Sequence, residues 1–546
     1  MELPEIPESE QTPLVKKLLE IIRQLLDRVH DLEVTVQEQR DEIAKLKGQK
    51  PRPDIKPSRL EKPATTGEQN KQRRDPTKRS QKPEPRIDRE MPLFPDNLPK
   101  GATFKGFEPY VVQDLIIKSE TTRYLRARFD LPEGGSVLAP LPSGVLPVEG
   151  GHFGANLVAY ILDQYHQAQT TEPLLLAQLW EYRIDISEGQ LHRILTENKD
   201  HFHQEKAEIL AAALLVSSYI GTDDTGARHQ GKNGFCTAIG NDLFAYFEST
   251  ASKSRLNFLQ ILQGQQRDYV INDMALDYWQ RQKLPAAVVE QLTQGPQEFT
   301  GESAWQARLA ALAISDQRHI RSATEGALLG GLVARGVSPE LGILSDGAQQ
   351  FVLFVHAACW IHAERPLAKL IPHNEEHRAA IEKIRTQIWE LYQELKAYRE
   401  QPEAAHQPVL EARFDALVEQ RTGYPSIDGP LKEMRDHKAD LLRVLERPEI
   451  PLHNNGRESD IREFVKRKKI SGGTRSAAGR CCRDTFASLK KTCRKLGICF
   501  WNYLQDRVRG LGQIPRLADL IRQKARGTPA CNAEGDSATI AGAVPA

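Results

Sequence analysis

Three acidic segments, far apart in the chain, most constrain what this sequence can fold into. They are Thr222-Asp223-Asp224-Thr225-Gly226, Ser345-Asp346-Gly347 and Asn454-Asn455-Gly456-Arg457-Glu458. Each ends or opens a stretch with the pattern of regular secondary structure, so each delivers a carboxylate at the end of an element. Three carboxylates that meet in space provide oxygen ligands for two divalent metal ions. The sequence therefore predicts a fold that brings these segments together.

The composition indicates several globular domains without a membrane anchor. A chain of 546 residues corresponds to roughly three or four domains. The N-terminus lacks the pattern of a secretory signal, and no apolar stretch of about 18 residues suits a membrane span. The seven cysteines contain no Cys-x-x-Cys pair, so neither a zinc knuckle nor a disulfide framework is expected. We expect a cytoplasmic protein with reduced thiols and no membrane partner.

Positive charge is concentrated in two stretches, although the net charge of the chain is only +1. Residues 50–90 contain 13 basic and 7 acidic residues, and residues 457–509 contain 15 basic and 5 acidic residues. Local fields of this size attract polyanions even when the whole chain is close to neutral.

Residues 15–46 have the heptad pattern of a coiled coil. Apolar residues recur at alternating spacings of three and four, with β-branched residues at the a positions and leucine at most d positions. This combination favours a parallel two-stranded coiled coil, so residues 1–48 are predicted to dimerise the chain. The alternative is an amphipathic helix that packs on its own globular domain.

The next 50 residues are predicted to form a linker. Residues 49–99 are rich in Pro, Lys and Arg and contain few large apolar residues. Such a segment buries too little apolar surface to offset the entropy of ordering. It either contacts phosphates or serves as a solvated spacer.

Residues 100–205 are predicted to combine a small β-rich module with three short helices. Ser187 and Gln190 form a capping box at the start of the third helix. The tight turn before Ser187 is typical of a helix-turn-helix, and a plain helical subdomain is the alternative. The expected strands lie near residues 110–112, 115–117 and 136–138, and the expected helices near 155–168, 172–182 and after 187.

The first acid lies on a predicted strand that opens an α/β core. Residues 218–224 have strand character and end in Asp223 and Asp224. Because successive side chains of a strand point to opposite faces, only one of these two faces a given site. Two further strands at 234–240 and 243–249 and then a helix follow. This order is the start of a ribonuclease-H-like fold.

A short apolar run at residues 341–346 places Asp346 at the end of a buried strand, beside the first acid. Asp273 is the alternative second acid. Downstream, Cys359 and His362 suggest a zinc site, but no second pair of ligands lies at the required spacing. Burial with one orienting hydrogen bond is the simpler interpretation, so no zinc is expected.

Glu458 lies in the first turn of a helix predicted to run to about Lys469. The helix dipole there favours the ionised carboxylate that a metal ligand requires. Cationic side chains continue along this helix and onto a final helical unit at 489–508, where Lys490 and Lys491 are expected to be exposed. We predict that they follow a DNA backbone, with a solvated basic loop as the alternative. The predicted DNA contacts are Arg462, Lys466, Arg467, Lys468, Lys469, Arg475, Arg480, Lys490, Lys491 and Arg494.

Together these motifs resemble the insertion sequence 66 family of bacterial DDE transposases, over about residues 136–509. The resemblance rests on the three acidic segments and on Cys359-Trp360-Ile361-His362-Ala363. It implies that the catalytic acids are Asp223 rather than Asp224, Asp346 rather than Asp273, and Glu458. Two features depart from the family pattern. No cysteine precedes Cys236, where the family commonly has a zinc-finger-like module, and His453 replaces the Asp that usually precedes Asn-Asn.

The resemblance implies a transposase that binds the ends of an insertion sequence and catalyses DNA cleavage and strand transfer. The three acids would hold two Mg²⁺ ions, with Mn²⁺ as a substitute. The implied partners are element-end and target DNA, further copies of the chain through residues 15–46, and accessory proteins of the same element. The implied location is the bacterial cytoplasm, in association with the nucleoid. The alternative is a non-catalytic dimeric DNA-binding regulator derived from a transposase.

The sequence thus predicts an α/β ribonuclease-H-like catalytic core with helical insertions, preceded by an N-terminal coiled coil and a small β/helical DNA-binding region. The predicted boundaries are 1–48 for the coiled coil, 49–99 for the linker, 100–205 for the DNA-binding region, 206–470 for the catalytic domain with insertions at about 255–340 and 370–450, 471–525 for a basic helical region and 526–546 for a disordered tail.

Overall fold

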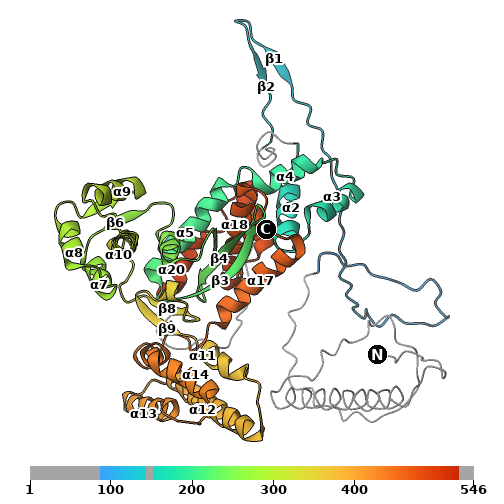
Figure 1. Ribbon diagram of the computed structural model, residues 1–546. Coiled ribbons are helices and arrows are strands. Elements are labelled where there is room, and N and C mark those ends of the chain that lie inside the picture. Colours follow the sequence, from blue (N-terminus) through green and yellow to red (C-terminus); the bar gives the residue numbers. More distant parts are fainter. Residues whose placement is uncertain (1–86, 143–151, 528–546) are drawn as a thin grey trace, which may run out of the picture. The chain divides into compact units, whose positions relative to one another are not determined.

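The computed structural model describes residues 87–142 and 152–527 (Figure 1). The predicted coiled coil at 15–46, most of the predicted linker and the tail after residue 527 lie outside these residues. The chain divides into two compact units, with the boundary after Gln113. Every helix and strand of the described residues belongs to the second unit.

Residues 87–142 contain little regular structure. The described part of the first unit, residues 87–113, has no helix or strand, and the rings of Phe104 and Phe107 lie 5.0 Å apart there. The strands predicted at 110–112 and 115–117 are absent, which corrects that expectation. Their apolar side chains are exposed, because a β-branched run forms a strand only when a second strand pairs with it.

One predicted strand of this region does form. In the second unit, β1 (Arg128–Asp130) and β2 (Ser136–Leu138) make an isolated antiparallel hairpin. Three short helices follow, namely α2 (Ala155–His166), α3 (Glu172–Glu181) and α4 (Glu188–Thr196). The predicted capping box opens α4, because the Ser187 and Gln190 side chains each accept the other residue's backbone N–H.

A five-stranded mixed sheet forms the centre of the second unit, in the order β5-β4-β3-β8-β9. Strand β4 alone runs antiparallel to the others, while β3, β8 and β9 pair in parallel. The strands are β3 (Tyr219–His229), β4 (Lys232–Gly240), β5 (Ala245–Thr250), β8 (Gly342–Ser345) and β9 (Val355–Ala358).

Helices cover both faces of this sheet. Because strand side chains alternate, Ile239 and Tyr246 face the core that includes α5 (Asp200–Val216), whereas their neighbours Ala238 and Phe247 pack against α17 (Asn455–Ser471). Two helices at the C-terminal end, α19 (Phe500–Arg509) and α20 (Leu517–Gly527), complete the α5 side. The sheet is therefore buried between two helical layers (Figure 1).

Helix α18 (Ala477–Leu496) covers the edge strand β5. Three backbone N–H groups of that strand, at Ala245, Phe247 and Ser249, donate to side chains of α18 rather than to another strand. The acceptors are Thr492, Ser488 and Asp484, which recur every four residues and so share one helix face. This covering satisfies a sheet edge that would otherwise pair with another chain.

Two helical excursions interrupt the sheet region. The first lies between β5 and β8 and is built around α10, and the second follows β9 and has its own hydrophobic core. The first contains α6 (Arg255–Gln263), β6 (Asp268–Val270), α7 (Asp273–Arg281), α8 (Ala286–Thr293), β7 (Glu298–Thr300), α9 (Glu302–Ala311) and α10 (Gln317–Ala334). The second contains α11 (Trp360–Ala368), α12 (Glu375–Glu400), α13 (Gln407–Val418), α14 (Pro425–Asp436), α15 (Lys438–Leu441) and α16 (Arg443–Glu446).

The described residues thus form a mixed α/β protein. None of their helices combines the length and the apolar character that crossing a bilayer requires.

Candidate functional site

The first two predicted acids lie on neighbouring parallel strands. Asp223 is on β3, and Asp346 directly follows β8, which pairs with β3 through Gly221 and Leu344. Burial, together with the nearby charges of Asp346, Asp224 and Glu458, raises the pKa of Asp223 to about 6. The structure therefore brings all three predicted acids within electrostatic reach of one another.

Asp224, the neighbour of Asp223, is held by neutral donors. Thr237 Oγ1 donates to one of its carboxylate oxygens at 2.6 Å, and Gln350 Nε2 donates to the other at 3.0 Å. Among the described residues, by contrast, the donor to the Asp223 carboxylate is the backbone N–H of Asp224, at 2.8 Å. The carboxylate of Asp223 therefore accepts fewer of these hydrogen bonds than that of Asp224 and is more available to a ligand.

Asp273, the alternative second acid, lies elsewhere. It is the exposed first residue of α7, in the first helical excursion. The charges that raise the pKa of Asp223 include Asp346 but not Asp273.

The third acid, Glu458, lies in the first turn of α17 among basic groups. Arg365 Nη2 contacts its Oε1 atom at 3.2 Å, and Arg462 Nη2 contacts its Oε2 atom at 3.3 Å. His362 Nε2 lies 3.6 Å from Oε1. Burial and the adjacent Arg365 charge lower the pKa of His362, which favours the neutral imidazole. Sequence reasoning missed Arg365, although it is one helical turn after His362 and so shares its face.

Two other residues of the third segment fasten α17 to the sheet. Asn454 precedes the helix but does not cap it with its side chain, because its Nδ2 donates to Thr222 O of β3 at 2.7 Å. Arg457 is 3% exposed and donates to the carbonyls of Asn241 and Phe244 at 3.0 and 3.3 Å. The motif therefore positions the helix that delivers Glu458.

This fastening explains two glycines in the strands below. A Cβ atom on Gly221 would lie 2.6 Å from the Asn454 side chain, and one on Gly240 would lie 2.2 Å from Arg457 Nη1. Because only glycine leaves this space, Asn454 and Arg457 approach the strand backbone closely.

The cluster around Cys359 also has a positioning role. Cys359 is buried, and its sulfur accepts the backbone N–H of Asn454 at 3.4 Å. The indole of Trp360 donates to Leu441 O at 2.8 Å, which joins α11 to α15 within the second excursion. These contacts agree with the prediction of burial plus an orienting hydrogen bond.

A buried hydrogen-bonded chain supports the turn that carries Asp346. Ser345 Oγ lies 2.9 Å from His356 Nε2 and accepts the backbone N–H of Gly347 at 3.1 Å. The other ring nitrogen of His356 lies 3.0 Å from Asp440. Sequence reasoning did not find this chain, because His356 and Asp440 are distant in sequence and carry no motif.

The donor chemistry suits Mg²⁺, which prefers carboxylate oxygens. Within residues 87–142 and 152–527, however, no group of three or more His, Cys, Asp or Glu side chains is arranged to hold a metal ion in this structure. The contacts of Glu458 with Arg365 and Arg462 occupy both of its oxygens. Metal binding at the three acids therefore requires Glu458 to exchange at least part of these contacts.

The predicted DNA contacts fall into three groups. The first group is exposed and comprises Arg462, Lys466, Lys469, Arg475 and Arg494. The second group is partly buried and comprises Arg467, Lys468 and Arg480. The third group, Lys490 and Lys491, is buried.

The burial of Lys490 and Lys491 corrects the expectation that they are exposed. Both ammonium groups form ion pairs with Glu463 of α17, and Lys491 also lies 3.6 Å from Asp460. Burial lowers the pKa of Lys490. Burial by itself would raise the pKa of Glu463, but the two lysines outweigh this effect and lower that pKa to about 2. The two lysines therefore fasten α18 to α17 and do not offer a surface to DNA.

The comparisons with known proteins point to the transposase class. A model of the transposase IS66 family matches residues 347–480. This stretch begins directly after Asp346 and contains Glu458 and the residues that hold it. The uncharacterized protein y4jO of Sinorhizobium fredii is 42% identical over 321 residues, which is 58% of this chain and all of that protein. No solved structure matches the chain.

Residues 347–480 are therefore a domain of the transposase IS66 family, and the chain is a relative of the uncharacterized protein y4jO.

Proposed function

We propose that this protein is an active DDE-type transposase that binds the ends of an insertion sequence and cuts and rejoins DNA at Asp223, Asp346 and Glu458. The observation that carries the proposal is the placement of Asp223 on β3 and of Asp346 directly after β8, the parallel neighbour of β3. Glu458 is near enough to raise, together with Asp346, the pKa of Asp223. Accumulated negative charge of this kind is typical of catalytic sites that hold divalent cations.

The sheet topology supports a ribonuclease-H-like core. In the order β5-β4-β3-β8-β9 the first strand in sequence is central, and only the second strand is reversed. Asp223 lies on that central strand, and Asp346 lies at the end of its parallel neighbour β8. Two of the acids therefore lie on adjacent strands in the middle of the sheet. The predicted insertions correspond to the two helical excursions.

Two Mg²⁺ ions, when bound, would activate the attacking oxygen and stabilise the leaving oxygen of the phosphodiester. Asp223, Asp346 and Glu458 are the residues that would hold them. The protein's own contribution is positioning. Arg457 and Asn454 fix the helix of Glu458, and the Ser345–His356 pair fixes the turn of Asp346. Arg365 pairs with Glu458 and so orients its carboxylate.

The exposed cations of α17 lead DNA to this site. Arg462, Lys466 and Lys469 recur at intervals of three to four residues, so they share one face of the helix that starts beside Glu458. A row of cations on one helix face contacts successive phosphates without reading the base sequence. In this proposal α4 is the part of a helix-turn-helix that reads the element end, and it exposes His192 and Arg193.

A strand-transfer assay tests the proposal. The full chain is incubated with Mg²⁺ or Mn²⁺ and with the DNA that flanks its coding sequence in the source genome, and the products are resolved on a sequencing gel. Wild type is expected to give cleaved and joined products, and Asp346→Asn is expected to lose at least 100-fold in rate. A DNA-binding regulator would give no product with either protein, and that result would refute the proposal.

Dimerisation through residues 15–46 is part of the same proposal, since both element ends must be cut together. Deletion of residues 1–48 is expected to abolish complexes that contain two ends and to leave binding of single ends intact. A native gel with two DNA lengths distinguishes these species. Unchanged pairing in the deletion variant would show that another part of the chain joins the two copies.

A further inference from the structure

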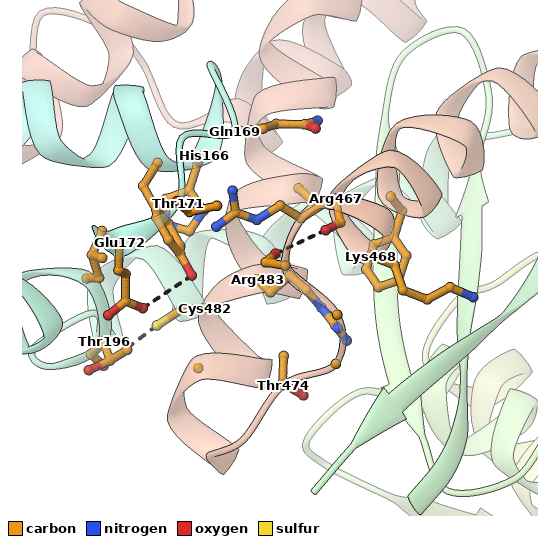
Figure 2. Close-up of a pocket in the computed structure, with 18 of the residues that line it drawn as sticks. His166, Gln169, Thr171, Glu172, Thr196, Arg467, Lys468, Thr474, Cys482 and Arg483 are labelled. Atoms are coloured by element: carbon orange, nitrogen blue, oxygen red, sulfur yellow. Dashed lines mark hydrogen bonds between the residues drawn. The ribbon is translucent and has the colours of Figure 1, made fainter. Parts of the chain in front are cut away.

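A cavity of about 590 Å³ lies between the helices α2–α4 and the joint of α17 with α18 (Figure 2). One side is formed by Tyr165 and His166 at the end of α2 and by Thr171 before α3. The opposite side is formed by Arg467 of α17 and by the glycine-containing loop 472–476. The cavity is separate from the three acids and contains none of them.

The wall formed by α17 and the following loop is cationic. Figure 2 shows the Arg467 side chain extended toward Thr171, whereas Lys468 points to the sheet. The Arg467 guanidinium lies 4.0 Å above the ring of Tyr165 and donates to Thr170 O at 3.3 Å. Arg475 belongs to the same wall and is exposed. This wall also contains the N-terminus of the 20-residue helix α18, which favours an anionic ligand.

The wall formed by α3 and α4 has the opposite character. It presents the carboxylates of Glu172 and Glu188, and Glu172 accepts a contact from His192 at 3.1 Å. A ligand that is anionic throughout, such as a duplex backbone, is repelled by this wall. A ligand with a phosphate at one end and N–H donors at the other matches both walls.

Two buried polar atoms in the cavity lining have no partner within the described residues. They are Nη2 of Arg467 and Nε2 of His166. Burial and the charge of Arg467 lower the pKa of His166 well below its usual range, so its ring is neutral and one ring nitrogen accepts a hydrogen bond. Buried groups of this kind normally have hydrogen-bond partners, so their presence here points to a ligand.

We propose that this cavity binds a single nucleotide that a DNA strand turns out of its helix. The phosphate lies at Arg467 and the loop 472–476, and the base lies between the ring of Tyr165 and the carboxylates of Glu172 and Glu188. A base stacks on aromatic and guanidinium groups regardless of its identity, and its exocyclic N–H groups are donors for the acidic wall. The volume lies within the range of pockets that enclose small ligands.

The position of the cavity relates it to the proposed catalytic acids, so the inference rests on the proposed function. Arg467 and Glu458 lie on the same helix, α17, nine residues apart. At 1.5 Å per residue this is about 14 Å, or roughly four base steps of 3.4 Å along a DNA strand. A nucleotide held here would fix the register of the strand relative to the acids.

Binding measured without metal tests the inference independently of catalysis. The full chain in EDTA is titrated into two fluorescein-labelled duplexes of the same sequence, one intact and one with a single extra, unpaired nucleotide, and fluorescence anisotropy gives the affinities. Wild type is expected to bind the bulged duplex at least about 10-fold more tightly, because stacking of one base contributes a factor of this size. Thymidine 5′-monophosphate is added as a competitor to detect a site for free nucleotides.

Two variants make the test specific. Thr171→Trp fills the cavity without removing a charge, and no helix cap is lost because the Thr171 side chain makes no capping bond. It is expected to abolish the preference for the bulged duplex and to keep the affinity for the intact duplex. Lys466→Ala is the matched control, since Lys466 is exposed on α17 outside the cavity and should weaken both duplexes equally. Circular dichroism confirms that each variant is folded.

Three results would overturn the inference. They are equal affinity of wild type for both duplexes, an unchanged preference in folded Thr171→Trp, and competition by the free mononucleotide as strong as that by the bulged duplex. The last result would assign the cavity to soluble nucleotides. If the preference is present but no strand transfer occurs, only the proposed catalytic function fails. If strand transfer occurs without the preference, only the cavity assignment fails.

Discussion

Replacing Arg457 with methionine is expected to loosen the helix that carries Glu458 while the sheet beneath it stays folded. The buried guanidinium donates to two carbonyls of the β4–β5 connection, Asn241 O and Phe244 O. Methionine keeps most of the aliphatic packing but leaves both carbonyls without this donor. Hydrogen bonds from a charged group contribute about 1.5–3 kcal/mol each, so the loss amounts to roughly 3–5 kcal/mol.

The loss is expected to be local. Asp460 forms an ion pair with Arg457 at 2.9 Å, which the substitution removes. Its ion pairs with Lys491 at 3.6 Å and Lys495 at 3.5 Å remain, so this buried carboxylate still has cationic partners. A fall of about 3 kcal/mol in the free energy of local opening corresponds to roughly 100-fold faster amide exchange. Hydrogen–deuterium exchange with mass spectrometry on peptides from α17 measures this rate. Peptides from α12–α14, which belong to a separate core, are the internal reference.

Arg462→Met is the matched control on the same helix. Its side chain is 75% exposed and makes one ion pair, with Glu458, so its removal is expected to change exchange by less than about fivefold. If α17 exchanges at the wild-type rate in Arg457→Met, or if all regions accelerate together, the fastening of α17 through Arg457 is not what holds Glu458 in place.

Three further substitutions test other parts of the structure. Burial and the charge of Arg457 lower the pKa of Lys495 from 10.5 to about 8. Between these two pH values the unfolded chain binds more protons at Lys495 than the folded chain. The stability of the wild type should therefore rise as the pH increases from about 8 to 10.5. Lys495→Met should therefore be more stable than wild type at pH 7, by up to roughly 3 kcal/mol, with the difference vanishing near pH 10.5 in thermal melts. Glu205 is fully buried and accepts Tyr503, Arg507 and the Leu517 N–H, so Glu205→Gln should destabilise the joint of α5 with α19 and α20 by about 3 kcal/mol, seen as a lower melting temperature. Gly240→Ala places a Cβ atom 2.3 Å from Phe244 O and should lower the melting temperature by several degrees, whereas Gly429→Ala, which meets no atom within 4 Å, should not.

The parts of the fold that sequence reasoning found are those fixed by local patterns. Alternating and continuous apolar runs placed β3, β4, β5 and β8 within a few residues. The choice of Asp223 over Asp224 came from the family resemblance and stays a prediction. Reasoning from local patterns failed for Lys490 and Lys491, because a lysine pair on an amphipathic helix has the same local pattern whether it faces water or a buried Glu463. Only the long-range packing of α18 on α17 decides between the two.

The candidate site, too, could be predicted from the sequence only in part. The three acids were predicted at the end or start of an element. Asp346 and Glu458 lie there, whereas Asp223 lies within β3, which continues to His229 because it pairs with β4 up to that residue. The supports of the acids lie in backbone contacts that no residue pattern encodes. Asn454 would be predicted as an ordinary helix cap, yet its amide donates to Thr222 O of β3. Arg457 would be predicted as one more DNA-facing cation, yet it is buried against the β4–β5 connection.

The negative charge of the candidate site is compensated in two different ways. Asp223 keeps a proton up to about pH 6, whereas Glu458 is paired with Arg365 and Arg462. A divalent cation that enters must displace the proton from the first and compete with two guanidinium groups for the second. In the proposed function, the affinity of this site for a metal ion would therefore depend on the two arginines, because they pair with both oxygens of Glu458. Arg365 lies on α11 of the second helical excursion, and Trp360 of that helix is bonded to Leu441 of α15, so the excursion contributes to the charge balance of the proposed catalytic site.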